Sequence, residues 1–349
     1  MLKPRPAVVK MAPYSPPASG RDGKLRLDFN ENTVGCSPRV TELLRRKLTK
    51  EQLTVYPEYE ATRHALAGYF QLPETQFLLT NGTDEAIQVL INTYVDNHDD
   101  VIVLHPSYAM YKFYAELAGA DVRELNFRKQ DLAFPMRELL AKIKPKTKAI
   151  LISNPNNPTG TAIGIGDIVR ILEAAPNAAV LIDEAYFEFY GVTALRLIDT
   201  YPNLVVSRTF SKVFGMAALR VGCLFSQAAN VKFMHKAQSP YSVNLLAAIA
   251  VRAAVEDRAY VDNYAANAVA ARELLYQGFA KRGIAYYPSQ ANFVLFQAGK
   301  RCIEIRDALR DRGVLVRDRS YELPGTIRVT AGTPEQATRF FSAFDEVWQ

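Results

Sequence analysis

Short apolar runs alternate with longer amphipathic stretches through most of the chain. From residue 37 onward, helix-like spacing over 38–48, 58–70 and 84–95 alternates with short apolar segments at 77–80 and 101–104. Short apolar runs bounded by turn residues are typical of strands that are buried on both faces. Strands that alternate with helices in this way predict βαβ units around a mostly parallel sheet.

The same alternation continues and then changes character after residue 240. Helix-like stretches follow Tyr108 and cover 135–143, and further strands are expected at 149–153, 180–183, 204–208 and 221–225. A long alanine-rich helical region, 243–280, precedes a smaller unit with strands at 293–297, 314–317 and 326–330 and a helix at 303–312. The fold class is therefore α/β, with a mostly parallel central sheet flanked by helices and a smaller α+β C-terminal domain.

Three segments are expected on this basis: an N-terminal arm over 1–36, a large domain over 37–250 and a small domain over 251–349. The first 30 residues are rich in proline, which favours an extended arm over a helix. No internal repeat is visible, so solenoids and propellers are excluded.

Composition narrows the class of protein. The 349 residues are 49% hydrophobic and carry a net charge of +6, with basic residues scattered along the chain. This excess suits an anionic small molecule and gives no reason to expect nucleic acid. The three cysteines and four histidines show no ligand spacing, so neither a disulfide framework nor a metal site is expected. Without a signal-peptide pattern or a long apolar run, we expect a cytoplasmic protein that does not enter membranes.

Polar residues follow the predicted strands, where doubly wound sheets bind their ligands. Residues 81–85 form a glycine turn that leads into a helix, whose free N–H groups can hold an anion, although an ordinary helix start has the same pattern. Residues 154–160 form a rigid polar loop with two prolines. Asp183 ends a buried strand and needs a cationic partner. Lys212 lies among small and apolar residues, which lower the pKa of an amine.

Together these residues meet the needs of pyridoxal phosphate. That cofactor requires a lysine for covalent attachment, an acid beside its pyridine nitrogen and a cradle for its phosphate. Ser211 and Arg220 supply a hydroxyl and a guanidinium for the cradle. Nicotinamide fits worse, because the Gly164-Ile165-Gly166 segment lacks the third glycine or alanine and does not directly follow a strand.

The sequence resembles the histidinol-phosphate aminotransferase family of fold-type I pyridoxal-phosphate aminotransferases from about Tyr14 to Pro334. The strings that carry the resemblance are 27–32, 153–160, 183–186, the block from Ser211 to Arg220, and 327–330. Departures include Thr33, Glu58, Thr83 and Ala218, which replace residues that are usual in the family.

The resemblance implies a set of cofactor residues. Lys212 would bind the cofactor and carry the proton, Asp183 would pair with the pyridine nitrogen, and Tyr186 would act beside them. The implied cofactor-binding set also contains Thr83, Asp84, Tyr108, Asn157, Thr209, Ser211 and Arg220. Tyr56 resembles a tyrosine that reaches the phosphate of the partner subunit, which implies a homodimer.

The resemblance also implies the reaction, the transfer of an amino group between L-histidinol phosphate and 2-oxoglutarate. The implied substrate residues are Tyr14, Asn30, Gly35, Arg317 and Arg328. For Arg317, a solvated strand end is an equally good interpretation. Three alternatives remain: an aromatic amino-acid aminotransferase of the same family, a decarboxylase on the same scaffold, and a pyridoxal-sensing domain of a transcription regulator. The last is disfavoured because about thirty proline-rich residues leave no room for a DNA-binding module.

Overall fold

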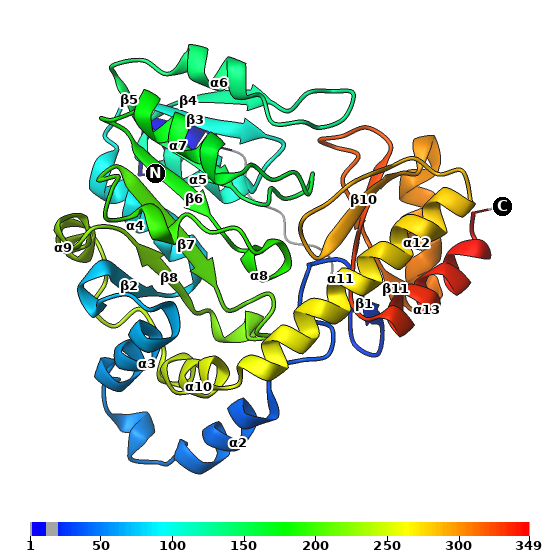
Figure 1. The fold of residues 1–349 in the computed structure, drawn as a ribbon, viewed down its shortest axis with the longest axis horizontal. Helices are drawn as coiled ribbons and strands as arrows, with labels where there is room; N and C mark the ends of the chain where they lie inside the picture. Colours follow the sequence, from blue (N-terminus) through cyan, green and yellow to red (C-terminus); the bar gives the residue numbers. More distant parts are fainter. Residues whose placement is uncertain (1, 12–19, 349) are drawn as a thin grey trace.

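The computed structural model describes residues 2–11 and 20–348 and contains a central sheet with strand order β2-β8-β7-β6-β5-β3-β4 (Figure 1). Neighbouring strands from β7 through β6, β5 and β3 to β4 run parallel, whereas β8 is antiparallel to both β7 and β2. The mostly parallel sheet that the sequence predicts is confirmed. Its strands are β2 (Phe77–Thr80), β3 (Asp100–His105), β4 (Asp121–Asn126), β5 (Thr147–Ser153), β6 (Ala179–Asp183), β7 (Leu204–Thr209) and β8 (Gly222–Phe225).

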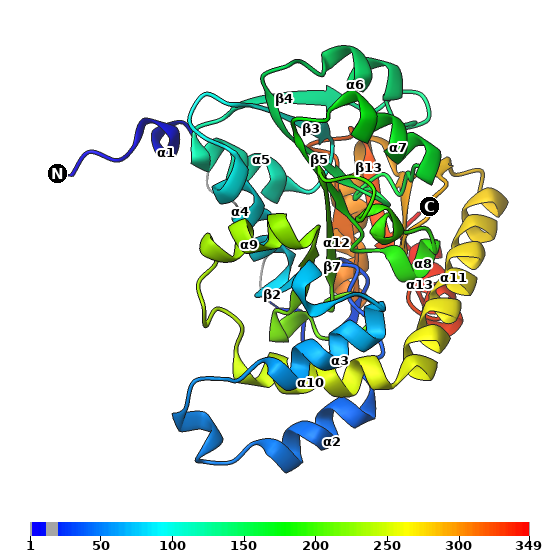
Figure 2. The same cartoon turned by 60° about the vertical axis from the view of Figure 1, so that its left-hand side comes forward.

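Alternate residues of the central strands face two separate cores, because side chains in a strand point to opposite faces with period two. In β5, Ile150 and Ile152 face one core, while Ala149 and Leu151 face the other. Figure 2 shows a layer of helices on each side of the sheet. One layer is α4 (Gly82–Tyr94), α5 (Ala109–Ala118) and α9 (Ala228–Lys236), and the other is α6 (Met136–Lys142), α7 (Ile165–Ala174) and α8 (Phe187–Tyr190).

The predicted helical region 243–280 consists of two helices. They are α10 (Leu245–Glu256) and α11 (Arg258–Lys281), which separate at Asp257, where φ is −101° and ψ is 60°. Helices α2 (Pro38–Lys47) and α3 (Glu60–Phe70) contact α10. The long helix α11 then runs from the central sheet toward the C-terminal part of the chain (Figure 1).

The C-terminal part forms a second sheet, which is antiparallel and has the strand order β12-β13-β10-β9. Its strands are β9 (Tyr286–Tyr287), β10 (Phe293–Gln297), β12 (Arg317–Asp318) and β13 (Thr326–Thr330). Helices α12 (Cys302–Asp311) and α13 (Pro334–Asp345) cover it around a separate apolar core that includes Phe279, Phe296, Phe340 and Phe344. The division into domains at 36/37 and 250/251 stays a prediction.

Two details differ from the expectation based on the sequence. Residues 314–317 do not form one strand, because β11 (Val314–Leu315) pairs in parallel with β1 (Leu25–Arg26), whereas β12 pairs with β13 in the antiparallel C-terminal sheet. The extended arm contains a short helix, α1 (Pro6–Lys10), because proline at the first helical position has a suitable φ and no N–H that needs a partner. None of the helices in the described part of the chain has both the length and the apolar character needed to cross a membrane.

Candidate functional site

A cavity of about 320 Å³ lies where the carboxyl ends of β5, β6 and β7 meet the N-terminus of α4. Parallel strands of a doubly wound sheet bring their carboxyl ends to one edge, which is why segments distant in sequence converge here. Most of the predicted cofactor residues line this cavity: Thr83, Tyr108, Asn157, Asp183, Tyr186, Thr209, Ser211, Lys212 and Arg220. Phe29 and Glu31, which belong to the string 27–32, line it as well, as does Arg21, which no motif marks.

Asp183 supplies a buried carboxylate at the floor of the cavity. Its side chain is 3% exposed, and Tyr111 donates a 2.7 Å hydrogen bond to Oδ2. Burial raises the pKa of Asp183 to about 6, and the hydrogen bond from Tyr111 opposes that rise. Oδ1 has no hydrogen-bond partner among the described residues. A buried carboxylate with one unsatisfied oxygen fits a cationic N–H of a ligand, such as a protonated pyridine nitrogen.

The next residue, Glu184, points away from the cavity, as the period of a strand requires. Its Oε2 accepts a 2.7 Å hydrogen bond from Nε of Arg208, and both side chains are buried. Glu184 Oε1 accepts a further bond from the backbone N–H of Ala194 at 2.6 Å. This buried ion pair fixes the end of β6 on the side away from the cavity. Asp183 therefore faces the cavity, whereas the adjacent Glu184 stabilises the fold.

The N-terminus of α4 and the Arg220 side chain form an anion cradle. The N-cap Asn81 makes no side-chain cap, so its side chain satisfies none of the first N–H groups of α4. Arg220 donates to Ser211 Oγ at 3.2 Å and lies 3.2 Å from Asp84 Oδ2. At Gly82, φ is +73°, and a Cβ there would lie 2.5 Å from Nη2 of Arg220. Only glycine lets the guanidinium approach the helix so closely, and this cradle fits a phosphate.

Tyr108 forms one wall of the cavity and is fixed by an acid. Its hydroxyl donates a 2.6 Å hydrogen bond to Asp84 Oδ1. Burial and the charge of Asp84 raise the pKa of Tyr108. Asp84 itself does not line the cavity, so the structure places it behind both Tyr108 and Arg220. The phenol therefore stays protonated and presents an apolar ring to a flat ligand.

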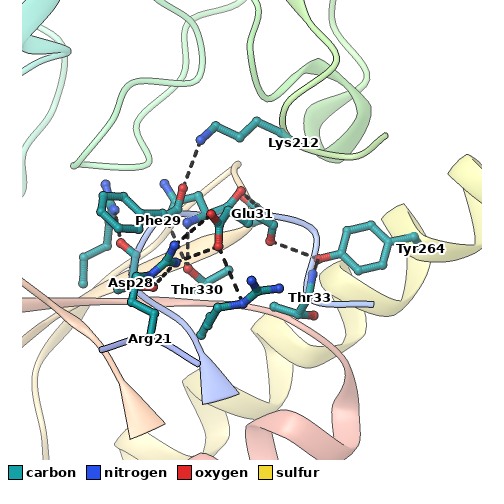
Figure 3. Close-up of polar contacts among 12 residues, drawn as sticks. Arg21, Asp28, Phe29, Glu31, Thr33, Lys212, Tyr264 and Thr330 are labelled. Atoms are coloured by element: carbon teal, nitrogen blue, oxygen red, sulfur yellow. Dashed lines mark hydrogen bonds and ion pairs between the residues drawn. The ribbon is translucent and has the colours of Figure 1, made fainter. Parts of the chain in front are cut away.

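Lys212 reaches into the cavity from the loop after β7. Its Nζ donates a 3.0 Å hydrogen bond to the backbone carbonyl of Phe29 (Figure 3). Burial, with the nearby positive charge of Arg328, lowers the pKa of Lys212 to about 8. Because a neutral amine is the nucleophilic form, this environment favours reaction with a carbonyl compound near neutral pH.

Arg21 braces the segment that holds Lys212 in place. Its guanidinium donates to Asp28 Oδ1 at 2.8 Å and to Glu31 Oε2 at 2.7 Å, and lies 4.4 Å from the Phe29 ring centroid (Figure 3). Burial alone would raise the pKa of Glu31, but the hydrogen bonds from Arg21 outweigh it and the pKa is lowered. No local pattern marks Arg21, since its partners are defined only by the folded chain.

A second hydrogen-bonded group connects the cavity to the C-terminal sheet. Asn30 donates from Nδ2 to the Tyr186 hydroxyl at 3.0 Å, and its N–H donates to Thr330 Oγ1 at 3.1 Å. Arg328 donates to the carbonyl of Asp28 at 2.6 Å and to Asn157 Oδ1. Asn30 and Arg328 therefore adjoin the cavity through the residues that line it.

The remaining predicted residues lie elsewhere or outside the described chain. Tyr56 is 75% exposed and stacks on Tyr241, with ring centroids 4.4 Å apart. Gly35 accepts a 3.0 Å hydrogen bond from the Tyr260 hydroxyl and does not line the cavity. Arg317 lines a neighbouring cavity instead. Tyr14 lies outside the described residues.

Comparisons with known proteins agree with this geometry. The model of the family "Aminotransferase class I and II" matches residues 22–344. A histidinol-phosphate aminotransferase of Symbiobacterium thermophilum is 39% identical over 98% of this chain and 98% of its own length. That of Bacillus subtilis strain 168 is 33% identical over 94% of this chain and 92% of its own.

Solved structures show the same fold. A putative histidinol-phosphate aminotransferase from Erwinia carotovora atroseptica has a TM-score of 0.86 at 24% identity, covering 96% of this chain and 100% of that one. The Sinorhizobium meliloti histidinol-phosphate aminotransferase in complex with pyridoxal-5'-phosphate has a TM-score of 0.86 at 21% identity, covering 98% and 96%.

Proposed function

Because the chain belongs to the aminotransferase class I and II family, we propose that it exchanges an amino group between L-histidinol phosphate and 2-oxoglutarate. The cofactor is pyridoxal 5'-phosphate, and we place the reaction in the cytoplasm. One observation carries the proposal. A lysine amine of lowered pKa, a buried carboxylate with a free oxygen and a phosphate-type cradle line one cavity of about 320 Å³. The names of the curated relatives support the donor.

Each residue then has a task that follows from its surroundings. Bound pyridoxal phosphate supplies an electron-withdrawing ring that stabilises negative charge at the donor's amine-bearing carbon. Asp183 would hold the proton on the ring nitrogen through Oδ1. The α4 N-terminus, Ser211 and Arg220 would bind the phosphate. Lys212 Nζ would take the proton from the donor carbon and return it, since an amine with a pKa of about 8 serves as both base and acid.

The donor's phosphate is the group that would distinguish histidinol phosphate from an amino acid. Arg328 is 4% exposed and faces Arg317 across the pair β12 and β13. Burial, with the charges of Arg319 and Arg317, lowers the pKa of Arg328 to about 10. Two guanidinium groups in register repel one another, and a dianion is better suited than a monoanionic carboxylate to offset that repulsion.

A half-reaction on the holoenzyme tests the donor. L-Histidinol phosphate and, separately, phenylalanine are added without any oxo acid, and loss of the bound cofactor's absorbance is followed. Fast loss at micromolar histidinol phosphate, with far more phenylalanine required, is the expected result. Equal or faster loss with phenylalanine would assign the protein to the aromatic branch, and carbon dioxide release would indicate a decarboxylase. In Arg317→Ala, kcat/KM should fall for the phosphorylated donor only.

We also propose that the active form is a homodimer. Leu53, Val55, Tyr56 and Tyr241 are each more than half exposed, and three of them lie within one short segment. An exposed apolar group of this kind is typical of a subunit contact. Sedimentation of the wild type and Tyr56→Ser tests this. A monomeric wild-type holoenzyme with full turnover would contradict it.

A further inference from the structure

The side chain of Asn32 joins the segment before α2 to the loop that carries Lys212. It is 4% exposed, and its Nδ2 donates a 2.8 Å hydrogen bond to the backbone carbonyl of Val213, the residue that follows Lys212. Its Oδ1 accepts the backbone N–H groups of Val34 and Gly35, each at 2.9 Å. One buried amide therefore fixes its own segment through the oxygen and the lysine loop through the nitrogen.

The two segments also meet backbone to backbone. Gly215 has φ of +69°, and a Cβ there would lie 2.5 Å from the carbonyl carbon and oxygen of Gly35. The N–H of Gly215 donates to the carbonyl of Lys212 at 3.0 Å, which closes a turn directly after the lysine. A side chain at residue 215 would push this turn away from Gly35, so glycine permits the close approach that the bond from Asn32 needs.

Helix α11 fixes the residues that follow Asn32. The Tyr264 hydroxyl accepts the backbone N–H of Thr33 at 3.1 Å (Figure 3), and the Tyr260 hydroxyl donates to the carbonyl of Gly35 at 3.0 Å. Both tyrosines belong to α11. The amide of Asn32 is therefore anchored to a long helix and provides a fixed point for the lysine loop.

Lys212 is held at both ends of its side chain by this one segment. The carbonyl of Phe29 accepts Nζ at 3.0 Å, and Asn32, three residues further on, holds the backbone beside Lys212. The flexible four-carbon stem between these two points has many rotamers, so the amine has one position only when both ends are held. The bond to Phe29 must break when the amine reacts, whereas the bond to Val213 does not involve the reacting atom.

We propose that Asn32 is a positioning residue that acts through Lys212 and sets the place from which its amine attaches to the cofactor and moves the donor's proton. Asn32 does not line the cavity, so it acts without touching cofactor or donor. A reacting group that is misplaced by about 1 Å can lose about a hundredfold in rate. The part of the proposal that concerns the donor's proton rests on the proposed function, whereas the part that concerns attachment rests on the cofactor alone.

The rate at which pyridoxal phosphate attaches to the cofactor-free protein at pH 8 tests the proposal without any turnover. Asn32→Ala loses both the donor and the acceptor, and Asn32→Asp keeps the acceptor but adds a charge, so the two variants share only the loss of the N–H donor. We expect attachment to be about tenfold slower in both, because each leaves the buried carbonyl of Val213 without its hydrogen bond.

Asn203→Asp is the matched control. The side chain of Asn203 also donates to backbone carbonyls, those of Leu172 at 3.0 Å and Ala175 at 2.9 Å. It precedes the amino end of β7, whereas Lys212 follows the carboxyl end of the same strand. The control therefore makes the same chemical change away from the cavity, and its attachment rate should equal that of the wild type.

The half-reaction of the holoenzyme, counted per bound cofactor, separates positioning from a loss of folded protein. The rate should fall at least tenfold in both Asn32 variants, because misfolding lowers the amount of bound cofactor but not the rate of each loaded site. With the donor deuterated at its amine-bearing carbon, the hydrogen isotope effect should be at least as large as in the wild type, because the proton transfer is the step that slows.

Four results would overturn the proposal: wild-type attachment in either Asn32 variant, an equal loss in Asn203→Asp, an unchanged rate per bound cofactor, or a smaller isotope effect. Failure of the proposed function looks different. In that case the wild type attaches the cofactor but turns over neither L-histidinol phosphate nor phenylalanine, and the attachment rates still decide the role of Asn32.

Discussion

Replacing Asp183 with asparagine is expected to stabilise the cofactor-free protein while it removes amino transfer. The carboxylate is 3% exposed, one of its oxygens has no partner among the described residues, and burial raises its pKa from 3.8 to about 6. A carboxyl group with a raised pKa binds its proton more tightly in the folded chain. The stability that this group contributes is therefore fully present below pH 3.8 and is lost as the pH rises through 6.

The size of this loss follows from the shift. One pKa unit corresponds to about 1.4 kcal/mol, so ionised Asp183 costs the cofactor-free protein about 3 kcal/mol at pH 8. At pH 5 the group is still mostly protonated in the folded chain, and the cost is roughly half as large. The amide of the variant carries no charge, and its oxygen still accepts the hydrogen bond from Tyr111. Asp183→Asn should therefore raise the free energy of unfolding by up to about 3 kcal/mol at pH 8.

Urea denaturation of the cofactor-free wild type and variant at pH 5 and pH 8 measures the effect, with the exposed Asp311→Asn as control. The same variant should lose about a hundredfold or more in turnover as holoenzyme, since it cannot hold the charge on the cofactor ring. If Asp183→Asn gains no more stability at pH 8 than at pH 5, ionisation of the buried carboxylate does not destabilise the cofactor-free protein. If turnover is unchanged, Asp183 does not serve the cofactor.

Three further outcomes are expected. Glu184→Gln removes one of two buried carboxylates beside Arg208, the other being Glu188 at 3.6 Å, so the free energy of unfolding should fall by about 1.5–3 kcal/mol in urea titrations. Attachment of pyridoxal phosphate to the cofactor-free protein should speed up about tenfold per pH unit and level off above pH 8, because the neutral amine of Lys212 reacts and its pKa is lowered to about 8. A plateau already reached at pH 6 would contradict that value. Gly82→Ala should weaken cofactor binding, measured by absorbance titration, since the new Cβ would meet Arg220 at 2.5 Å.

Apolar pattern alone located the buried strands well, because burial on both faces leaves an unbroken apolar run. The predicted strands at 77–80 and 293–297 coincide with β2 and β10. The strand predicted at 326–330 coincides with β13, although polar and apolar residues alternate there. The edge strand β4 was missed, since most of its residues are exposed or partly exposed and its sequence, Asp121–Asn126, is largely polar. An overlooked signal was available for α13, which begins with a capping box of Thr333 and Gln336.

The site residues that could be predicted are those that stand at the ends of predicted strands. Asp183 and Lys212 could be found because they stand at strand ends, and the comparisons support the cofactor that they imply. Phe29 and Glu31 lie in the string 27–32 that carries the family resemblance, but the string alone assigned no task to them. Arg21 could not be found, because it precedes β1 outside any motif and its ion pairs with Asp28 and Glu31 exist only in the folded chain. Proline content predicted an extended arm there, but it could not indicate which surface the arm lies on.

That segment shows why the reactive lysine depends on both ends of the chain. Residue 30 has φ of +58°, a conformation that costs an asparagine about 1 kcal/mol or more and persists only where contacts hold it. The contacts come from 300 residues away, where Thr330 accepts the N–H of Asn30 and donates its own N–H to the carbonyl of Leu27 at 2.9 Å. The carbonyl that holds Lys212 lies between these two anchored residues. The position of the Lys212 amine therefore depends on the packing of β13 against residues 27–30. A substitution in β13 that breaks these hydrogen bonds should disturb the cofactor site even though the substituted residue does not line it.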